Sequence, residues 1–202
     1  MLHKEKDRLR DNVQIPSSLS LEQMKKCSET NNFARWPFVP EKPREDGERN
    51  NGAFDLLANP EQIDLIHEAT EDNGLRALIA QLNSSDGLFM TLGCASGQEG
   101  DLYYSYLELT FRNADVARDE HSITSLEDQW KAWVTEHCQK QPEFAAALLA
   151  AVAWEYREFS LRKAEPQYLV TVYSRAINAA DHALLLTWIE GFFSSYEKNQ
   201  SH

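Results

Sequence analysis

Residues 102–112, LYYSYLELTFR, alternate regularly between two sets of side chains. One set is Tyr103, Ser105, Leu107, Leu109 and Phe111, and the other is Tyr104, Tyr106, Glu108, Thr110 and Arg112. A period of two with several aromatic residues is typical of a half-buried β-strand. The preceding apolar run, LFMTLGC, favours another strand, and CASGQEGD between the two predicts a loop. Residues 88–112 are therefore predicted to form an antiparallel hairpin, which commits the fold to a sheet.

A third strand is predicted at residues 167–174, QYLVTVYS, which are rich in β-branched and aromatic residues. Sequence features before and after the predicted strands are typical of helices. Asn59 before Pro60 predicts a helix start with a capping side chain. A glycine at position 74 predicts a helix stop, after which helical spacing resumes. Two helices, or one with a break, are therefore expected before the hairpin.

Three further helices are predicted in the second half of the chain. A capping box at Thr124 or Ser125 opens the first. Pro142 opens the second, whose apolar stretch at residues 144–154 predicts a helix buried on nearly all sides. Asn178 caps the last. This order predicts an α+β fold, with a small, mostly antiparallel sheet packed with about five helices.

An extended arm is predicted at residues 1–53, followed by a single acidic α+β domain at residues 54–202. Four prolines punctuate the arm, and residues 18–26 favour a short helix. Phe33, Trp36 and Phe38 form an apolar stretch that either packs against the domain or docks on a partner. Packing is the favoured alternative, because so much aromatic area is seldom left in water.

The charge of the chain is distributed unevenly. Its formal net charge is −12, yet residues 1–49 hold ten Lys and Arg against nine Asp and Glu. Residues 50–202 hold ten bases and 23 acids. An acidic domain repels phosphate, so we expect no direct binding to a nucleic-acid backbone. It attracts a basic protein instead, although an acidic surface also serves solubility alone.

Three cysteines and a charged N-terminal segment bear on localisation. An odd, sparse cysteine count is unlike a secreted disulfide framework. The first residues, MLHKEKDRLRDN, lack the apolar core of a signal peptide. We therefore expect a cytoplasmic protein. No apolar run is long enough to cross a bilayer, so no membrane association is expected.

Catalytic and metal-binding signals are sparse. Neither phosphate-binding glycine motif is present, and neither H-E-x-x-H nor C-x-x-C occurs, so we expect no cofactor and no metal site. Cys94 is the candidate nucleophile, because it follows a strand and precedes small residues. It needs a histidine base within reach, and the alternative is a small buried cysteine. The candidate bases are His67, His121, His137 and His182.

A protein-binding face is predicted on the second strand of the hairpin. Tyr104 and Tyr106 share a face with Glu108, and tyrosines beside a carboxylate suit an interface. The alternative is that a helix covers this face and makes both tyrosines part of the core. The full set of predicted binding residues is Glu99, Asp101, Tyr104, Tyr106, Glu108, Glu127 and Asp128.

Three functions remain open from the sequence. The first is an acidic protein-binding module, most concretely an immunity or inhibitor protein that neutralises a basic partner such as a toxin enzyme. The second is an enzyme without a short motif, with Cys94 as nucleophile. The third is an adaptor subunit of a larger assembly, which docks through the arm at Phe33, Trp36 and Phe38.

Overall fold

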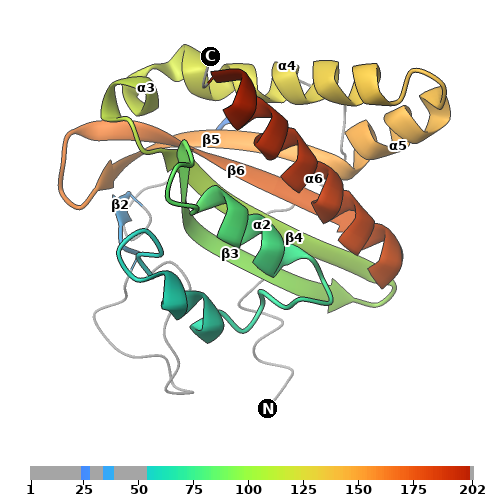
Figure 1. Ribbon diagram of the computed structural model, residues 1–202, viewed down its shortest axis with the longest axis horizontal. Coiled ribbons are helices and arrows are strands. Elements are labelled where there is room, and N and C mark those ends of the chain that lie inside the picture. Colours follow the sequence, from blue (N-terminus) through green and yellow to red (C-terminus); the bar gives the residue numbers. More distant parts are fainter. Residues whose placement is uncertain (1–23, 28–33, 39–53, 201–202) are drawn as a thin grey trace.

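The computed structural model of the chain describes residues 24–27, 34–38 and 54–200 (Figure 1). The described strands are β1 (Lys25–Lys26), β2 (Arg35–Trp36), β3 (Phe89–Glu99), β4 (Leu102–Phe111), β5 (Val152–Leu161) and β6 (Pro166–Ala176). The described helices are η3 (Pro60–Leu65, a 3-10 helix), α2 (Leu75–Leu82), α3 (Ala114–Arg118), α4 (Glu120–His137), α5 (Pro142–Ala151) and α6 (Ala179–Gln200). The chain has the predicted α+β fold.

One mostly antiparallel sheet organises the molecule, with the strand order β1-β5-β6-β4-β3 and β2 also paired with β5. The β3–β4 and β5–β6 hairpins meet where β4 pairs with β6, from Tyr103 opposite Ala176 to Leu109 opposite Val170. The two short strands β1 and β2 run parallel to β5 along its outer edge. The sheet therefore joins segments from the described parts of the arm and from both halves of the domain.

The hairpin at residues 88–112 is confirmed, but its predicted loop is mostly strand. β3 continues through Cys94 to Glu99, and the turn is confined to residues 100–101. The small residues extend the strand because they leave room for the tyrosines opposite them. A Cβ placed on Gly97 would lie 2.8 Å from the hydroxyl oxygen of Tyr104. Cys94 consequently lies within a strand and not at its end.

The prediction of one long buried helix after Pro142 is wrong. α5 ends at Ala151, and the following residues form β5, which pairs with β6. Leu148 is the one fully buried residue of α5. An uninterrupted apolar run has no period, so the sequence pattern did not separate the end of the helix from the start of the strand. The alternation of Val152, Trp154 and Tyr156 marks β5, because these three side chains share a buried face.

The N-terminal ends of the helices differ from the predictions in three ways, although η3 does begin at the predicted Pro60. α4 begins at Glu120, earlier than predicted, because the Asp119 carboxylate accepts hydrogen bonds from the first backbone N–H groups of the helix. The unpredicted α3 is capped in the same way by Asn113. The Asn59 side chain makes no capping bond to η3. The predicted start of α6 is confirmed, since Asn178 Oδ1 accepts from Asp181 N at 2.8 Å.

Helices α2, α4 and α6 cover one face of the sheet and enclose the main core (Figure 1). α6 lies diagonally across the strands, with α2 beside it. Aromatic rings from each layer meet there. Trp130 of α4 lies 5.6 Å from Phe192 of α6, and Phe89 of β3 lies 5.1 Å from Phe193, measured between ring centroids. This core fixes the helices on the sheet.

Part of the predicted arm packs on the opposite face of the sheet. Trp36 and Phe38 are buried in a second apolar cluster with Met90, Leu92, Phe159 and Leu169. The indole Nε1 of Trp36 donates to the Leu92 carbonyl oxygen at 2.8 Å. Residues 24–27 are extended, so the end of the predicted helix at 18–26 is a strand. The rest of that helix and residues 39–53 lie outside the described residues, and the division at residue 53 stays a prediction.

Substitution of Trp36 tests how much this packing stabilises the domain. We expect Trp36→Ala to lower the free energy of unfolding by about 3–5 kcal/mol, because it removes a large buried ring. Trp36→Phe keeps most of the ring but loses the indole donor, which costs about 1 kcal/mol. Urea denaturation followed by circular dichroism measures both. Leu184→Ala is the control, because Leu184 is 45% exposed; a Trp36→Ala protein as stable as this control would contradict the prediction.

Candidate functional site

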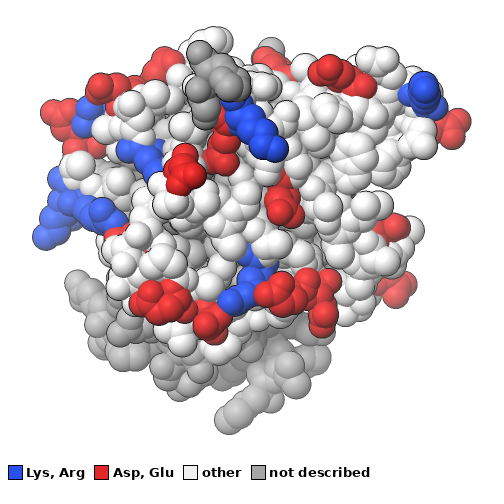
Figure 2. Space-filling model, in the orientation of Figure 1, with Lys and Arg blue, Asp and Glu red and all other residues white. Residues whose placement is uncertain are grey.

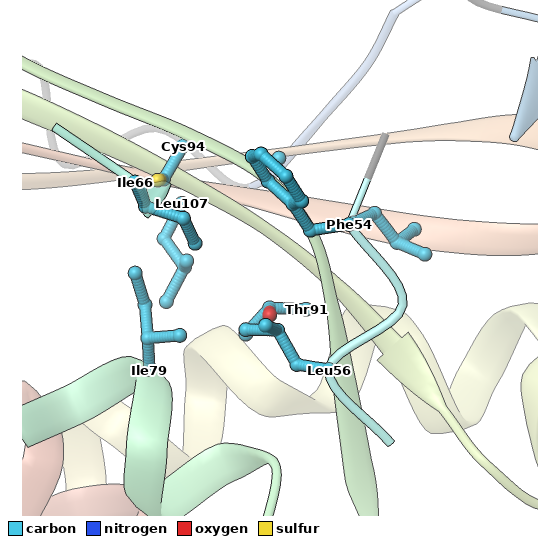
Figure 3. Close-up of a pocket in the computed structure, with 9 residues that line it drawn as sticks. Phe54, Leu56, Ile66, Ile79, Thr91, Cys94 and Leu107 are labelled. Atoms are coloured by element: carbon cyan, nitrogen blue, oxygen red, sulfur yellow. The ribbon is translucent and has the colours of Figure 1, made fainter. Parts of the chain in front are cut away.

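Cys94 lines a small apolar hollow between β3, α2 and the segment that leads into η3 (Figure 3). The hollow has a cavity volume of about 10 Å³, which is roughly the space that one water molecule needs. Sites that bind small molecules usually enclose about 300–1,000 Å³. The lining residues are Phe54, Leu56, Ile66, Ile79, Thr91, Leu92, Gly93, Cys94 and Leu107. Their apolar side chains offer few groups that orient a polar substrate.

The surroundings of Cys94 hold its thiol in the neutral form. Burial raises the pKa of the Cys94 thiol, and the negative charges of Glu68 and Glu108 raise it further. The thiolate is the nucleophilic form of cysteine, and reactive cysteines have lowered pKa values. The environment therefore works against the role predicted for this residue.

The buried histidine of α6 lies within hydrogen-bond distance of two serines. His182 Nε2 lies 3.2 Å from Ser105 Oγ and 3.3 Å from Ser174 Oγ, and the two hydroxyls are 2.6 Å apart. These serines face each other on β4 and β6. A serine beside a histidine is a chemical arrangement that can activate a nucleophile. All three residues are buried, so here the group links α6 to the middle of the sheet.

The predicted tyrosine face lies on the side of the sheet opposite the helices. Tyr104, Tyr106 and Glu108 are half-buried there, whereas Leu107 and Leu109 point into the main core. No described helix covers this face, so the alternative that a helix buries both tyrosines is not what the described residues show.

Glu108 on this face is already paired within the chain. Its Oε1 accepts a hydrogen bond from Arg157 Nη2 at 2.8 Å, and both side chains are almost fully buried. The Arg157 guanidinium lies 5.2 Å from the centre of the Phe38 ring. A buried charge needs such a partner, because removing it from water is costly. Glu108 therefore has a structural role that the sequence analysis did not assign.

Two tyrosines of neighbouring strands continue the same polar face. The rings of Tyr106 and Tyr173 are 6.3 Å apart, and the Tyr173 hydroxyl donates to Glu155 Oε2 at 3.0 Å. Burial raises the pKa of both hydroxyls, and nearby Glu108 and Glu155 raise it further. Both tyrosines are therefore neutral hydrogen-bonding groups at any physiological pH.

The acidic residues of the predicted set do not gather on one surface. Glu99 and Asp101 are exposed at the β3–β4 turn. Asp128 is exposed on a different element, helix α4. Glu127 is buried in α4, where Lys131 Nζ lies 3.1 Å from it and the Met24 backbone N–H donates to it. Of the predicted arm residues, Trp36 and Phe38 are buried, and Phe33 lies outside the described residues.

A group of acids that the sequence analysis did not single out lies on η3 and on the loop that follows it. We call Glu61, Asp64, Glu71 and Asp72, with Leu65 among them, the acidic strip. All five residues are exposed, and Leu65 keeps 52% of its surface in water. Arg76 links the strip, since it forms ion pairs with both Asp64 and Glu71. Figure 2 shows this row of carboxylates along the lower part of the molecule.

The sequence signal for this strip is simple. Residues 54–75 contain six acids and no Lys or Arg. The signal is visible in the sequence, but only the structure shows that the acids flank an exposed leucine. Exposed leucines are unremarkable singly, yet one within a charged surface supplies the apolar contact that a docking partner needs.

Within residues 24–27, 34–38 and 54–200, no three His, Cys, Asp or Glu side chains come together as ligands for a metal ion. In the same ranges, no helix combines the length and the apolar character needed to cross a bilayer.

Comparisons with protein-family models, with curated proteins and with solved structures give no match. The function has to be argued from the side chains of this chain and their surroundings.

Thiol labelling tests the environment of Cys94. We expect a thiol reagent to modify the half-exposed Cys27 quickly in the native protein. In a Cys27→Ala protein, we expect labelling to be at least about a hundredfold slower than after unfolding, because Cys94 and Cys138 are buried. Mass spectrometry identifies the labelled residue, and rapid labelling of Cys94 would restore it as a candidate nucleophile.

A double-variant cycle tests the pairing of Glu108 with Arg157. We expect Arg157→Met to lower the free energy of unfolding by about 3–5 kcal/mol, since it leaves a buried carboxylate without its partner. Arg157→Met combined with Glu108→Leu should recover most of this loss. Urea denaturation gives the coupling between the two sites, and additive effects would mean that Glu108 is free to serve a partner.

Proposed function

We propose that this protein binds a basic protein partner through its acidic domain. The most concrete form of the proposal is an immunity or inhibitor protein that neutralises a basic enzyme such as a toxin. Its main support is charge: residues 54–200 carry 23 Asp and Glu against ten Lys and Arg. An excess of this size accelerates the encounter with a positively charged protein.

The acidic strip supports a location for the contact. Its carboxylates are exposed, although Asp64 and Glu71 pair with Arg76. Glu108 and Glu127 of the predicted set are instead largely buried against partners within the chain. Leu65 adds an apolar surface among the charges. Interfaces combine an apolar centre with a polar rim, and the strip has this composition on a small scale. We therefore expect the basic partner to contact η3 and the loop after it.

The enzyme alternative has less support. It requires a thiolate at Cys94, and the burial of this residue favours the neutral thiol. It also requires space for a substrate, and the hollow beside Cys94 is smaller than most ligand sites.

The adaptor alternative loses its proposed contacts. It assigns docking to Phe33, Trp36 and Phe38, but Trp36 and Phe38 are buried against this chain's own sheet. A partner that took these rings would have to remove them from their apolar cluster. The cost of exposing that cluster makes such docking unfavourable.

Charge neutralisation on the strip tests the proposal. The protein is used as bait in extracts of the cells that produce it, bound proteins are eluted with increasing salt, and they are identified by mass spectrometry. We expect a stoichiometric basic partner, with affinity reduced about tenfold by Glu61→Gln with Asp72→Asn, because two attractive charges are lost. The purified partner then allows titration of each variant at fixed ionic strength.

A matched variant controls for net charge. Glu136→Gln with Glu143→Gln removes the same charge from exposed positions on α4 and α5. We expect this control to bind like the unchanged protein. Glu99→Gln with Asp101→Asn compares the hairpin turn that the sequence analysis favoured. Equal losses in all three variants would point to a general charge effect, and the absence of a basic partner at any salt would overturn the proposal.

A further inference from the structure

Lys26 of β1 lies among side chains from three different elements. We call Glu120, Tyr156, Glu158 and Tyr168 the lysine cage. The Lys26 Nζ lies 3.7 Å from Glu120 Oε1 and 3.4 Å from Glu158 Oε1. It also lies 5.8 Å and 5.3 Å from the ring centres of Tyr156 and Tyr168. Two carboxylates with two aromatic faces are a combination that recognises an ammonium group.

Glu120 and the two tyrosines of the cage are held together without help from Lys26, whereas Glu158 contacts Lys26 itself. Glu120 Oε1 accepts a hydrogen bond from the Tyr156 hydroxyl at 2.6 Å, and its Oε2 accepts one from the Tyr168 hydroxyl at 3.2 Å. The two rings are 6.0 Å apart in an edge-to-face arrangement. The hydrogen bond from Tyr156 is the largest influence that lowers the pKa of Glu120, so this carboxylate stays charged. The site is therefore preorganised for a cation.

The backbone next to the cage recognises an extended chain. β1 pairs in parallel with β5, with Lys26 opposite Tyr156, and the Cys27 N–H donates to the Tyr156 carbonyl oxygen at 2.8 Å. The Met24 N–H donates to the Glu127 carboxylate. Strand addition at a sheet edge, with a pocket for one side chain, is a common way to bind a peptide segment.

The chain's own segment forms a short strand at this edge, and its Met24 side chain packs against the main core. β1 consists of two residues, and the Lys26 side chain remains 47% exposed. Exposed ion pairs stabilise a structure only weakly. Lys26 also belongs to residues 1–49, which hold ten bases against nine acids, while the cage belongs to the acidic domain. The segment thus occupies the site in the way that a basic partner's peptide would.

We propose that the outer edge of β5 and the lysine cage bind an extended, lysine-bearing segment of a partner protein, and that Met24–Cys27 fills this site in the free protein. The inference rests on the proposed function and names a second point of contact for the same basic partner. Binding would replace the chain's own strand by the partner's strand, with its lysine in the cage. Met24–Cys27 would then compete with the partner's segment for the same site, and this competition would lower the apparent affinity of the protein for the partner.

Peptide binding to the full-length protein tests the inference. The probe is a fluorescein-labelled peptide that copies residues 21–30, with serine at the position of Cys27. Fluorescence anisotropy compares the unchanged protein with Lys26→Ala. We expect Lys26→Ala to bind the probe about tenfold more tightly, because its own segment competes less for the site. If circular dichroism shows that Lys26→Ala is unfolded, Lys26→Met is used in its place, because methionine keeps an unbranched side chain of similar size.

Two controls locate the binding. Lys26→Ala combined with Glu120→Gln and Glu158→Gln should bind the probe about tenfold less tightly than Lys26→Ala, because the cage has lost both charges. A probe with alanine at the position of Lys26 should show the same loss with the intact cage. Lys163→Ala, at an exposed position in the β5–β6 turn, should bind like the unchanged protein. Equal binding to all proteins, or no binding to any, would overturn the inference.

The partner assay separates this inference from the proposed function. If the cage-neutralised protein loses the probe and also captures the basic partner less well, the inference is supported. If it loses the probe but captures the partner as before, the cage is not the partner's site, and the acidic-domain proposal stands without it. If the probe binds as expected but extracts yield no basic partner, the site is supported and the proposed function fails.

Discussion

The pairing of β4 with β6 is the contact on which the rest of the structure depends. It joins two hairpins that are separated in the chain by α3, α4 and α5. This pairing brings Ser105 next to Ser174 on the helical side, and Tyr106 next to Tyr173 on the other side. The first pair receives His182 from α6, and the second continues toward the buried ion pair of Glu108 and Arg157. A shift of the β4–β6 register by one residue would move the side chains of one strand to the opposite faces of the sheet. Both the serine–histidine group and the Glu108–Arg157 pair would then be lost.

The sequence predicts those elements whose signals are local. The alternation in 102–112 and the β-branched run at 167–174 identify β4 and β6, and the caps at Asn178 identify α6. β5 was missed because its start continues the apolar run of α5. The pairing of Glu108 with Arg157 could not be predicted, since it depends on two strands that are not consecutive in the chain. The lysine cage could not be predicted either, because its residues come from three elements, α4, β5 and β6.

The acids of the chain fall into two classes that net charge alone does not separate. Some are buried or half-buried and hold donors of the same chain, as Glu108 holds Arg157 and Glu127 holds Lys131. Others, such as those of the acidic strip, face water. The exposed acids contribute more to the electrostatic field that an approaching protein meets, although Arg76 offsets part of the charge of Asp64 and Glu71. The predicted binding residues include acids of both classes, because the sequence does not show which carboxylates are paired within the chain.

The two short strands along β5 also bear on how the protein behaves in a crowded solution. A free strand edge offers backbone groups to any other chain, and natural proteins often protect such edges with charged residues or covering segments. β1 and β2 cover parts of β5 with a lysine pair and an arginine facing outward. The same segment that we propose as a competitor for a partner therefore also shields the sheet from joining a second copy. Loss of these few residues would leave backbone groups of β5 open to pairing with a second copy, which ties the protein's tendency to aggregate to the occupancy of a single strand position.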